Sequence, residues 1–175
     1  GIQESTITVT NDNELGAIQD INILASADAN THFGYQSRPL NQGVNNTSIG
    51  HQANRYVNVA PLNTTVAIGG FANANLDGVS GTRKEQVAIG FESMVDRPGT
   101  GDGYNTAVGY RTLKKGGQRN VAIGHTALEI INGGQRNTGV GMNALCGLIS
   151  GSFNTAIGYD TGCDILGDNN ICIGY

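Results

Sequence analysis

The hydrophobic residues of this chain are concentrated in short segments in which two β-branched or aromatic residues flank a small one and a glycine follows. VAIG at 66–69 and TAVG at 106–109 are typical of the nine copies. The spacing of the glycines is uneven, shortest between Gly109 and Gly124 and longest between Gly69 and Gly90. The full set is Gly34, Gly50, Gly69, Gly90, Gly109, Gly124, Gly141, Gly158 and Gly174. Nine such copies predict one structural unit per repeat.

Each copy has the alternation of a β-strand. The residues directly before the glycine form the apolar column: Phe33, Ile49, Ile68, Ile89, Val108, Ile123, Val140, Ile157 and Ile173. Three places before the glycine stands a β-branched column of Val, Thr or Ile. Side chains alternate across a strand, so these two columns share one face, and both contain residues that strands prefer. The sequence therefore predicts nine short strands.

The position between those columns, the small column, suggests close packing. It holds Ser48, Ala67, Ala88, Ala107, Ala122, Gly139, Ala156 and Cys172, with His32 in a degenerate first copy. Together with the glycines it forms a face nearly without side chains, which another backbone can approach. We expect the protomers of an oligomer to meet there.

Asparagine stands four places before the glycine in seven copies. This asparagine column comprises Asn30, Asn46, Asn105, Asn120, Asn137, Asn154 and Asn170. Asparagine tolerates the left-handed backbone conformation and forms turns, so it is predicted to make the corner that starts each strand. Leu113, Leu128 and Leu145 follow the glycine in three copies and are expected to fill the interior.

The period of the repeat, roughly 17 residues, is too short for βαβ units and typical of a solenoid. The predicted fold is all-β, a parallel β-solenoid. One coil buries a few apolar side chains at ~1.5–3 kcal/mol each, against ~1–2 kcal/mol of backbone entropy per residue. This shortfall favours self-association, and we predict a homotrimer.

The chain divides into two regions. Residues 1–29 precede the repeats and contain two candidate strands, at 5–10 and 18–25, which we interpret as a cap or junction. Residues 30–175 form the repeat domain of nine coils, with insertions at 73–86 and 93–104. Since the last copy stops at Tyr175, we expect the chain to be part of a longer protein.

Composition narrows the possible functions. Of 175 residues, 27 are Gly without a three-residue period, which excludes collagen. The net charge of −4 and pI near 5.2 argue against a nucleic-acid partner, and no apolar run is long enough for membrane insertion.

The chain has three cysteines: Cys146, Cys163 and Cys172. Their odd number does not suggest a disulfide framework, and their spacing does not suggest zinc. We expect them to be small buried hydrophobes with free thiols, as in a reducing compartment.

Candidate chemistry is sparse, and the sequence predicts neither an enzyme nor a cofactor or metal. Asp164 and Asp168 could face each other across a loop, but turn residues in solvent explain them better. His32, His51 and His125 could hold a metal or anion on a threefold axis, although packing roles are favoured.

Binding surfaces are the remaining candidates. An aromatic column directly follows the glycines at Tyr35, His51, Phe91, Tyr110, His125, Tyr159 and Tyr175. It could bind sugars, but residues one coil apart are expected to stack on each other instead. Receptor contacts are better placed on the insertions. The charged residues proposed there as contacts are Arg83, Lys84, Glu85, Arg97 and Asp102. The alternative, which the sequence supports equally, is that the insertions are surface loops without a binding role.

The segments NTAVGYRTL, NVAIGHTAL, NTGVGMNAL and NTAIGYDTG resemble the head repeats of trimeric autotransporter adhesins (the YadA-like head). They resemble related repeats of bacteriophage tail fibres more closely. The resemblance covers residues 30–175. It implies a left-handed β-roll in an intertwined or side-by-side homotrimer on a surface fibre, with the strands forming the core and the subunit packing.

The resemblance leads to a structural and attachment function. The uneven period and the free thiols favour a tail-fibre segment of a virion that spaces or presents surfaces binding a host glycan or protein. The alternative is the head of a bacterial adhesin, located on the outer surface of the cell. A polysaccharide-degrading tail spike is the third candidate.

Overall fold

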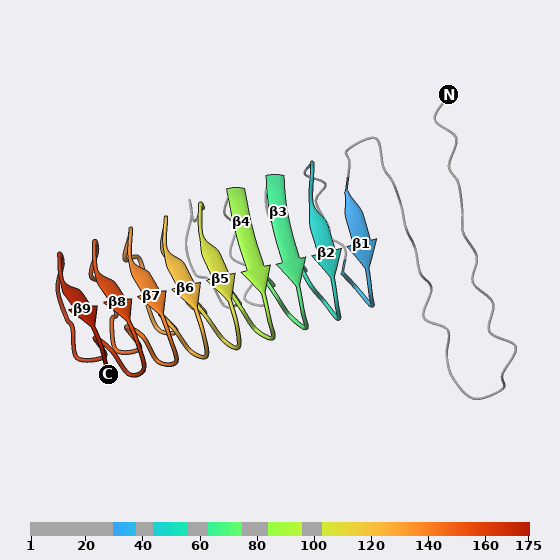
Figure 1. Cartoon of the computed structure of the whole chain (residues 1–175). Helices are drawn as coiled ribbons and strands as arrows, with labels where there is room; N and C mark the ends of the chain where they lie inside the picture. Colours follow the sequence, from blue (N-terminus) through green and yellow to red (C-terminus); the bar gives the residue numbers. More distant parts are fainter. Residues whose placement is uncertain (1–29, 38–43, 56–62, 75–83, 96–102) are drawn as a thin grey trace, which may run out of the picture.

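The structure, a computed structural model, describes residues 30–37, 44–55, 63–74, 84–95 and 103–175 (Figure 1). These residues form nine strands in one sheet. The strands are β1 (Thr31–Phe33), β2 (Thr47–Ile49), β3 (Asn63–Ile68), β4 (Lys84–Ile89), β5 (Thr106–Val108), β6 (Val121–Ile123), β7 (Thr138–Val140), β8 (Thr155–Ile157) and β9 (Ile171–Ile173). The candidate strands at 5–10 and 18–25 lie outside the described residues.

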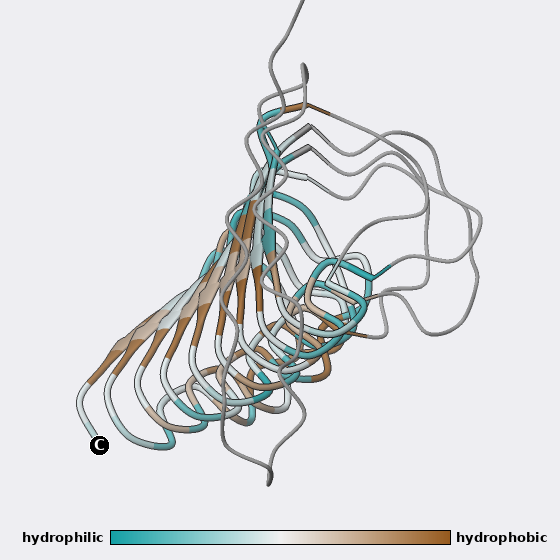
Figure 2. Cartoon of the chain, turned by 90° about the vertical axis from the view of Figure 1, so that its right-hand side faces the viewer, coloured by the Kyte–Doolittle hydropathy of each residue, from teal (hydrophilic) through white to brown (hydrophobic). Residues whose placement is uncertain are grey.

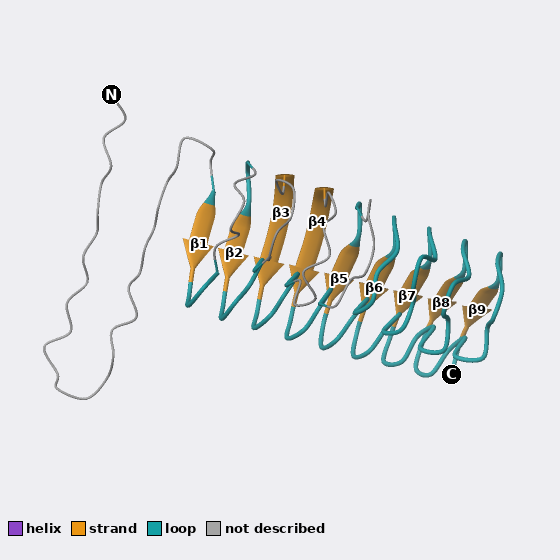
Figure 3. Ribbon diagram, turned by 180° about the vertical axis from the view of Figure 1, so that it is seen from behind, coloured by secondary structure: helices purple, strands orange, loops and turns teal. Residues whose placement is uncertain are grey.

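Every strand pairs in parallel with the next one along the chain. The pairing aligns equivalent positions of the repeat, such as Ala67 with Ala88 and Ile68 with Ile89. The fully described connections, from β5 to β9, return behind the sheet after each strand (Figure 3). The predicted all-β parallel β-solenoid is therefore confirmed, and the described residues contain no helix.

The small column lies inside the solenoid. Ala67, Ala88, Ala107, Ala122 and Ala156 are completely buried within the chain's own core. The prediction that protomers meet at this column is wrong. Each coil is short and must close on itself, so the inward face of the sheet has room only for small side chains.

Larger side chains from the return segments complete the core. Leu113, Leu128 and Leu145 are fully buried against the small column, as the sequence predicted. Met94, Ile131 and Leu148 are also fully buried. The core is thus an alternation of small strand residues and large loop residues, which suits close packing.

The apolar column faces outward. Ile49, Ile123 and Ile157 are 37%, 39% and 42% exposed, although residues of this type are usually buried. Hydrophobic residues form a band along the row of strands in Figure 2. We call this surface, made of the apolar and β-branched columns, the outward sheet face.

The glycine after each strand permits the close approach that the sequence predicted. The φ angles of the nine glycines lie between 118° and 137°, a region that L side chains rarely adopt. A Cβ added to Gly69 would lie 2.6 Å from the carbonyl oxygen of Gly90. The approaching backbone is therefore the next coil of the same chain.

The asparagine column forms a buried hydrogen-bonded ladder. The backbone N–H of Asn154 donates to Oδ1 of Asn137 at 2.9 Å, and Nδ2 of Asn137 donates to the Gly151 carbonyl at 2.8 Å. The left-handed conformation belongs instead to the preceding residue, such as Arg136 with φ 55°. The predicted corner role of asparagine is corrected accordingly, because its amide is needed inside the coil.

The glycine column generates a stability prediction. Gly69→Ala should destabilise the protein by about 3 kcal/mol, through a left-handed φ and a backbone clash. Gly167→Ala is the control, because an added Cβ there meets nothing within 4 Å. Urea unfolding followed by circular dichroism measures both variants. Equal stability of the two would contradict this role of the glycine.

Candidate functional site

The aromatic column forms a ladder of rings along the solenoid. Tyr35 stacks on His51 with centroids 5.4 Å apart, Phe91 stacks on Tyr110 at 5.9 Å, and Tyr110 on His125 at 4.8 Å. Farther along, Tyr159 stacks on Tyr175 at 5.4 Å. The expectation that these residues stack on one another is confirmed. At least one face of each stacked ring is thus occupied by a neighbouring ring.

Phe71 continues the ladder where the repeat has Gly70 after the anchor glycine, whereas Met142 interrupts it between His125 and Tyr159. Its ring packs edge-on against His51 at 5.2 Å and Phe91 at 5.9 Å. The sequence alignment missed Phe71 because it lies one position late, with φ 56°. A residue shifted by one position falls outside its column when the copies are aligned, so its contact cannot be recognised from the alignment.

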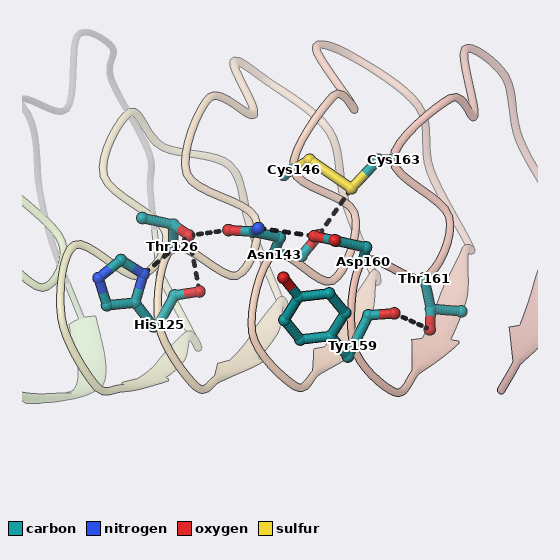
Figure 4. Close-up of a disulfide and its surroundings, with 8 residues drawn as sticks. All are labelled: His125, Thr126, Asn143, Cys146, Tyr159, Asp160, Thr161 and Cys163. Carbon is teal, nitrogen blue, oxygen red and sulfur yellow. Dashed lines mark hydrogen bonds between the residues drawn. A yellow bond between two sulfur atoms is a disulfide. The ribbon is translucent and has the colours of Figure 1, made fainter. Parts of the chain in front are cut away.

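A polar ladder runs beside the rings, formed by residues two places after the glycine. The Thr126 hydroxyl lies 2.5 Å from Oδ1 of Asn143, whose Nδ2 donates to Asp160 at 2.6 Å (Figure 4). One coil before Thr126, Arg111 of the same column contacts Glu92 of that column at 3.4 Å, and it also contacts Glu129 of the next coil's return segment at 3.0 Å. Polar side chains here therefore satisfy one another across the coils.

Cys146 and Cys163 form a disulfide between adjacent coils (Figure 4). The prediction of three free thiols is wrong for this pair, and Cys172 is the free cysteine of the described residues. The two cysteines are 17 residues apart, which equals the local repeat, and their Cα atoms are 4.9 Å apart. That separation suits a disulfide. A comparison of cysteine spacing with the repeat length could have identified the pair.

The predicted receptor-contact residues are only partly described. Lys84 and Glu85 belong to β4 rather than to a loop, because the end of the insertion extends the pairing with β3. Arg83, Arg97 and Asp102 lie outside the described residues. The five residues are therefore not brought together into a described site.

The remaining candidates for chemistry have structural contacts. Oδ1 of Asp168 accepts the backbone N–H of Ser152 at 2.7 Å, while Asp164 is exposed. His51 and His125 belong to the aromatic ladder. In the described ranges, no group of three or more His, Cys, Asp or Glu residues is arranged to hold a metal ion. Nor does this part of the chain contain a helix with the length and apolar character needed to cross a membrane.

Sequence reasoning missed a column of exposed residues directly before the asparagines. Tyr104, Arg119, Arg136 and Phe153 occupy it on four consecutive coils. The Arg119 guanidinium carbon lies 5.4 Å from the Tyr104 ring centroid, and that of Arg136 lies 5.0 Å from the Phe153 centroid. The available signal was the segment GGQRN, which occurs identically at 116–120 and 133–137.

The disulfide generates a second prediction. Thiol titration of the unfolded, unreduced protein should find one free thiol per chain, and three after reduction. Reduction should lower the free energy of unfolding by about 3 kcal/mol, because the bond closes a short loop in the unfolded chain. A Cys146→Ser, Cys163→Ser double variant should lose the same stability and be insensitive to reductant. Three free thiols before reduction would refute the pairing.

Comparison with known proteins does not assign the chain to a family. No protein-family model, curated protein or solved structure matches it. Its function must therefore be inferred from the surfaces described above.

Proposed function

We propose that this chain is a structural and attachment segment of a homotrimeric surface fibre, most consistent with a phage tail fibre. The observation that carries the proposal is the outward sheet face. Its apolar column runs through nine consecutive strands, and its exposed members are Phe33, Ile49, Ile123, Ile157 and Ile173. Apolar residues gathered on one exposed surface mark an interaction site.

A homotrimer accounts for the outward sheet face. Three sheets around a common axis would turn their apolar columns toward one another and bury them together. The residues Ile123, Val140 and Ile157 are partners on consecutive parallel strands, so they form a row along the solenoid. The resemblance of the repeats to trimeric fibre proteins supports three copies rather than two.

The ladders suit a mechanical role. The aromatic rings, the buried asparagines and the disulfide each join adjacent coils, so a load along the fibre passes through many parallel contacts. A rigid scaffold of this kind can present surfaces to a host cell while its own conformation stays constant. We propose that it binds a host glycan or protein without cleaving it.

The adhesin head on a bacterial outer surface is the second candidate, and the disulfide favours it. Disulfides persist mainly in oxidising compartments. Because Cys146 and Cys163 are paired, free thiols no longer favour the tail fibre over the adhesin. The uneven spacing of the repeats still favours the tail fibre of a virion.

The assembly is tested by mutation of the outward sheet face. The protein should sediment as a trimer, and Ile123→Arg should dissociate it, because three charges would be buried at the axis. Ile149→Arg is the matched control, since Ile149 is exposed on a return segment rather than on a strand. Analytical ultracentrifugation distinguishes the trimer from dissociated monomers. A folded monomeric wild type would refute the proposal.

Attachment is tested with fluorescently labelled trimer on intact cells. The tail-fibre proposal expects saturable binding to bacteria, whereas the adhesin alternative expects binding to animal cells or extracellular matrix. The Ile123→Arg variant should bind more weakly by at least tenfold, because it loses the multivalency of the trimer. Binding to no surface would contradict an attachment role, and release of reducing sugar from a host polysaccharide would identify a tail spike.

A further inference from the structure

Arg119 and Arg136 lie side by side on consecutive coils. They occupy the same position of two identical GGQRN segments. The backbone holds this alignment through the parallel bridge of Gln118 with Gln135 and a 3.0 Å hydrogen bond from Arg136 N–H to the Gln118 carbonyl. Neighbouring backbones in a sheet are ~4.8 Å apart, so the two side chains leave the backbone at adjacent points of one surface.

Each arginine stacks on an aromatic ring on its outer side. Arg119 lies over Tyr104 and Arg136 over Phe153, at 5.4 and 5.0 Å. The rings are 49% and 50% exposed. Stacking occupies the faces of the guanidinium groups and leaves their edge N–H groups for bidentate hydrogen bonds. The two arginines are therefore oriented by the rings while their donors stay accessible.

The charge of this pair is not balanced by the described part of the chain. Like charges opposite each other on adjacent strands are destabilising. Arg111 shows the usual solution, with Glu92 and Glu129 on the coils to either side at 3.4 and 3.0 Å. No described carboxylate forms an ion pair with Arg119 or Arg136. An external anion would remove the repulsion between them.

We propose that Arg119 and Arg136, flanked by Tyr104 and Phe153, bind anionic groups of an acidic polysaccharide. Carboxylate, sulfate and phosphate oxygens all match paired guanidinium donors. The half-exposed rings provide apolar surface against which sugar rings can pack. A nucleic acid is disfavoured, because the chain carries a net charge of −4 and only two arginines line this site. This inference deepens the proposed attachment function and rests on it.

The test measures binding of the whole protein to four immobilised polymers: polygalacturonate, dextran sulfate, poly(glycerol phosphate) and neutral dextran. Binding to at least one acidic polymer and none to neutral dextran supports the site, and the preferred polymer identifies its anion. An increase from 50 to 300 mM NaCl should weaken binding at least tenfold, because the contact is ionic and exposed. Equal binding of single-stranded DNA would indicate a general polyanion surface and overturn the proposal.

The deciding variant replaces both arginines, Arg119→Gln with Arg136→Gln, and should lose at least tenfold in affinity. Its matched control, Arg55→Gln with Lys115→Gln, removes the same charge at other described positions and should bind as wild type. Circular dichroism and sedimentation must show both variants folded and trimeric. Unchanged binding of the first variant, equal loss in the control, or dissociation of only the first variant would overturn the proposal.

Failure of this inference is distinguishable from failure of the proposed function. If the double variant still attaches to cells as a trimer and binds acidic polymers like wild type, the arginine site is wrong and the attachment function stands. If the wild-type protein attaches to no cell and is not trimeric, the proposed function itself is wrong.

Discussion

The stacking of each coil directly on the next depends on the glycine that ends every strand. At that point two backbones approach so closely that a single methyl group on Gly69 would meet the carbonyl of Gly90. The same glycines adopt φ angles that other residues avoid. Together the two constraints hold successive coils in one register, and every other contact of the solenoid follows from that register.

Because the register aligns equivalent positions of successive coils, residues that recur in the sequence form ladders along the solenoid. Aromatic residues stack into a column, asparagine amides bond to one another inside the coil, and Arg111 lies between two glutamates. The disulfide between Cys146 and Cys163 and the pair of Arg119 and Arg136 have the same origin, since each pair is separated by one local repeat of 17 residues. Equivalent residues of successive coils therefore contact one another and act together as a group.

The two surfaces that carry the functional proposals differ in chemistry. The outward sheet face carries an apolar column over nine strands, which suits self-association along an axis. The arginine pair with its flanking rings is small, charged and confined to four coils. Assembly and ligand binding can thus be tested separately, because they depend on different columns of the same repeat.

The sequence by itself determined the strands, the parallel solenoid and the ring ladder, because nine aligned copies reveal which positions are equivalent. Only the tertiary structure decided which side of the strand faces inward. Alternation shows that Ala122 and Ile123 point in opposite directions, but the core could lie on either side. The return segments decide it: Leu113, Leu128 and Leu145 fill the space behind the sheet and leave room only for small residues such as alanine. The isoleucines are consequently outside, where a partner can reach them.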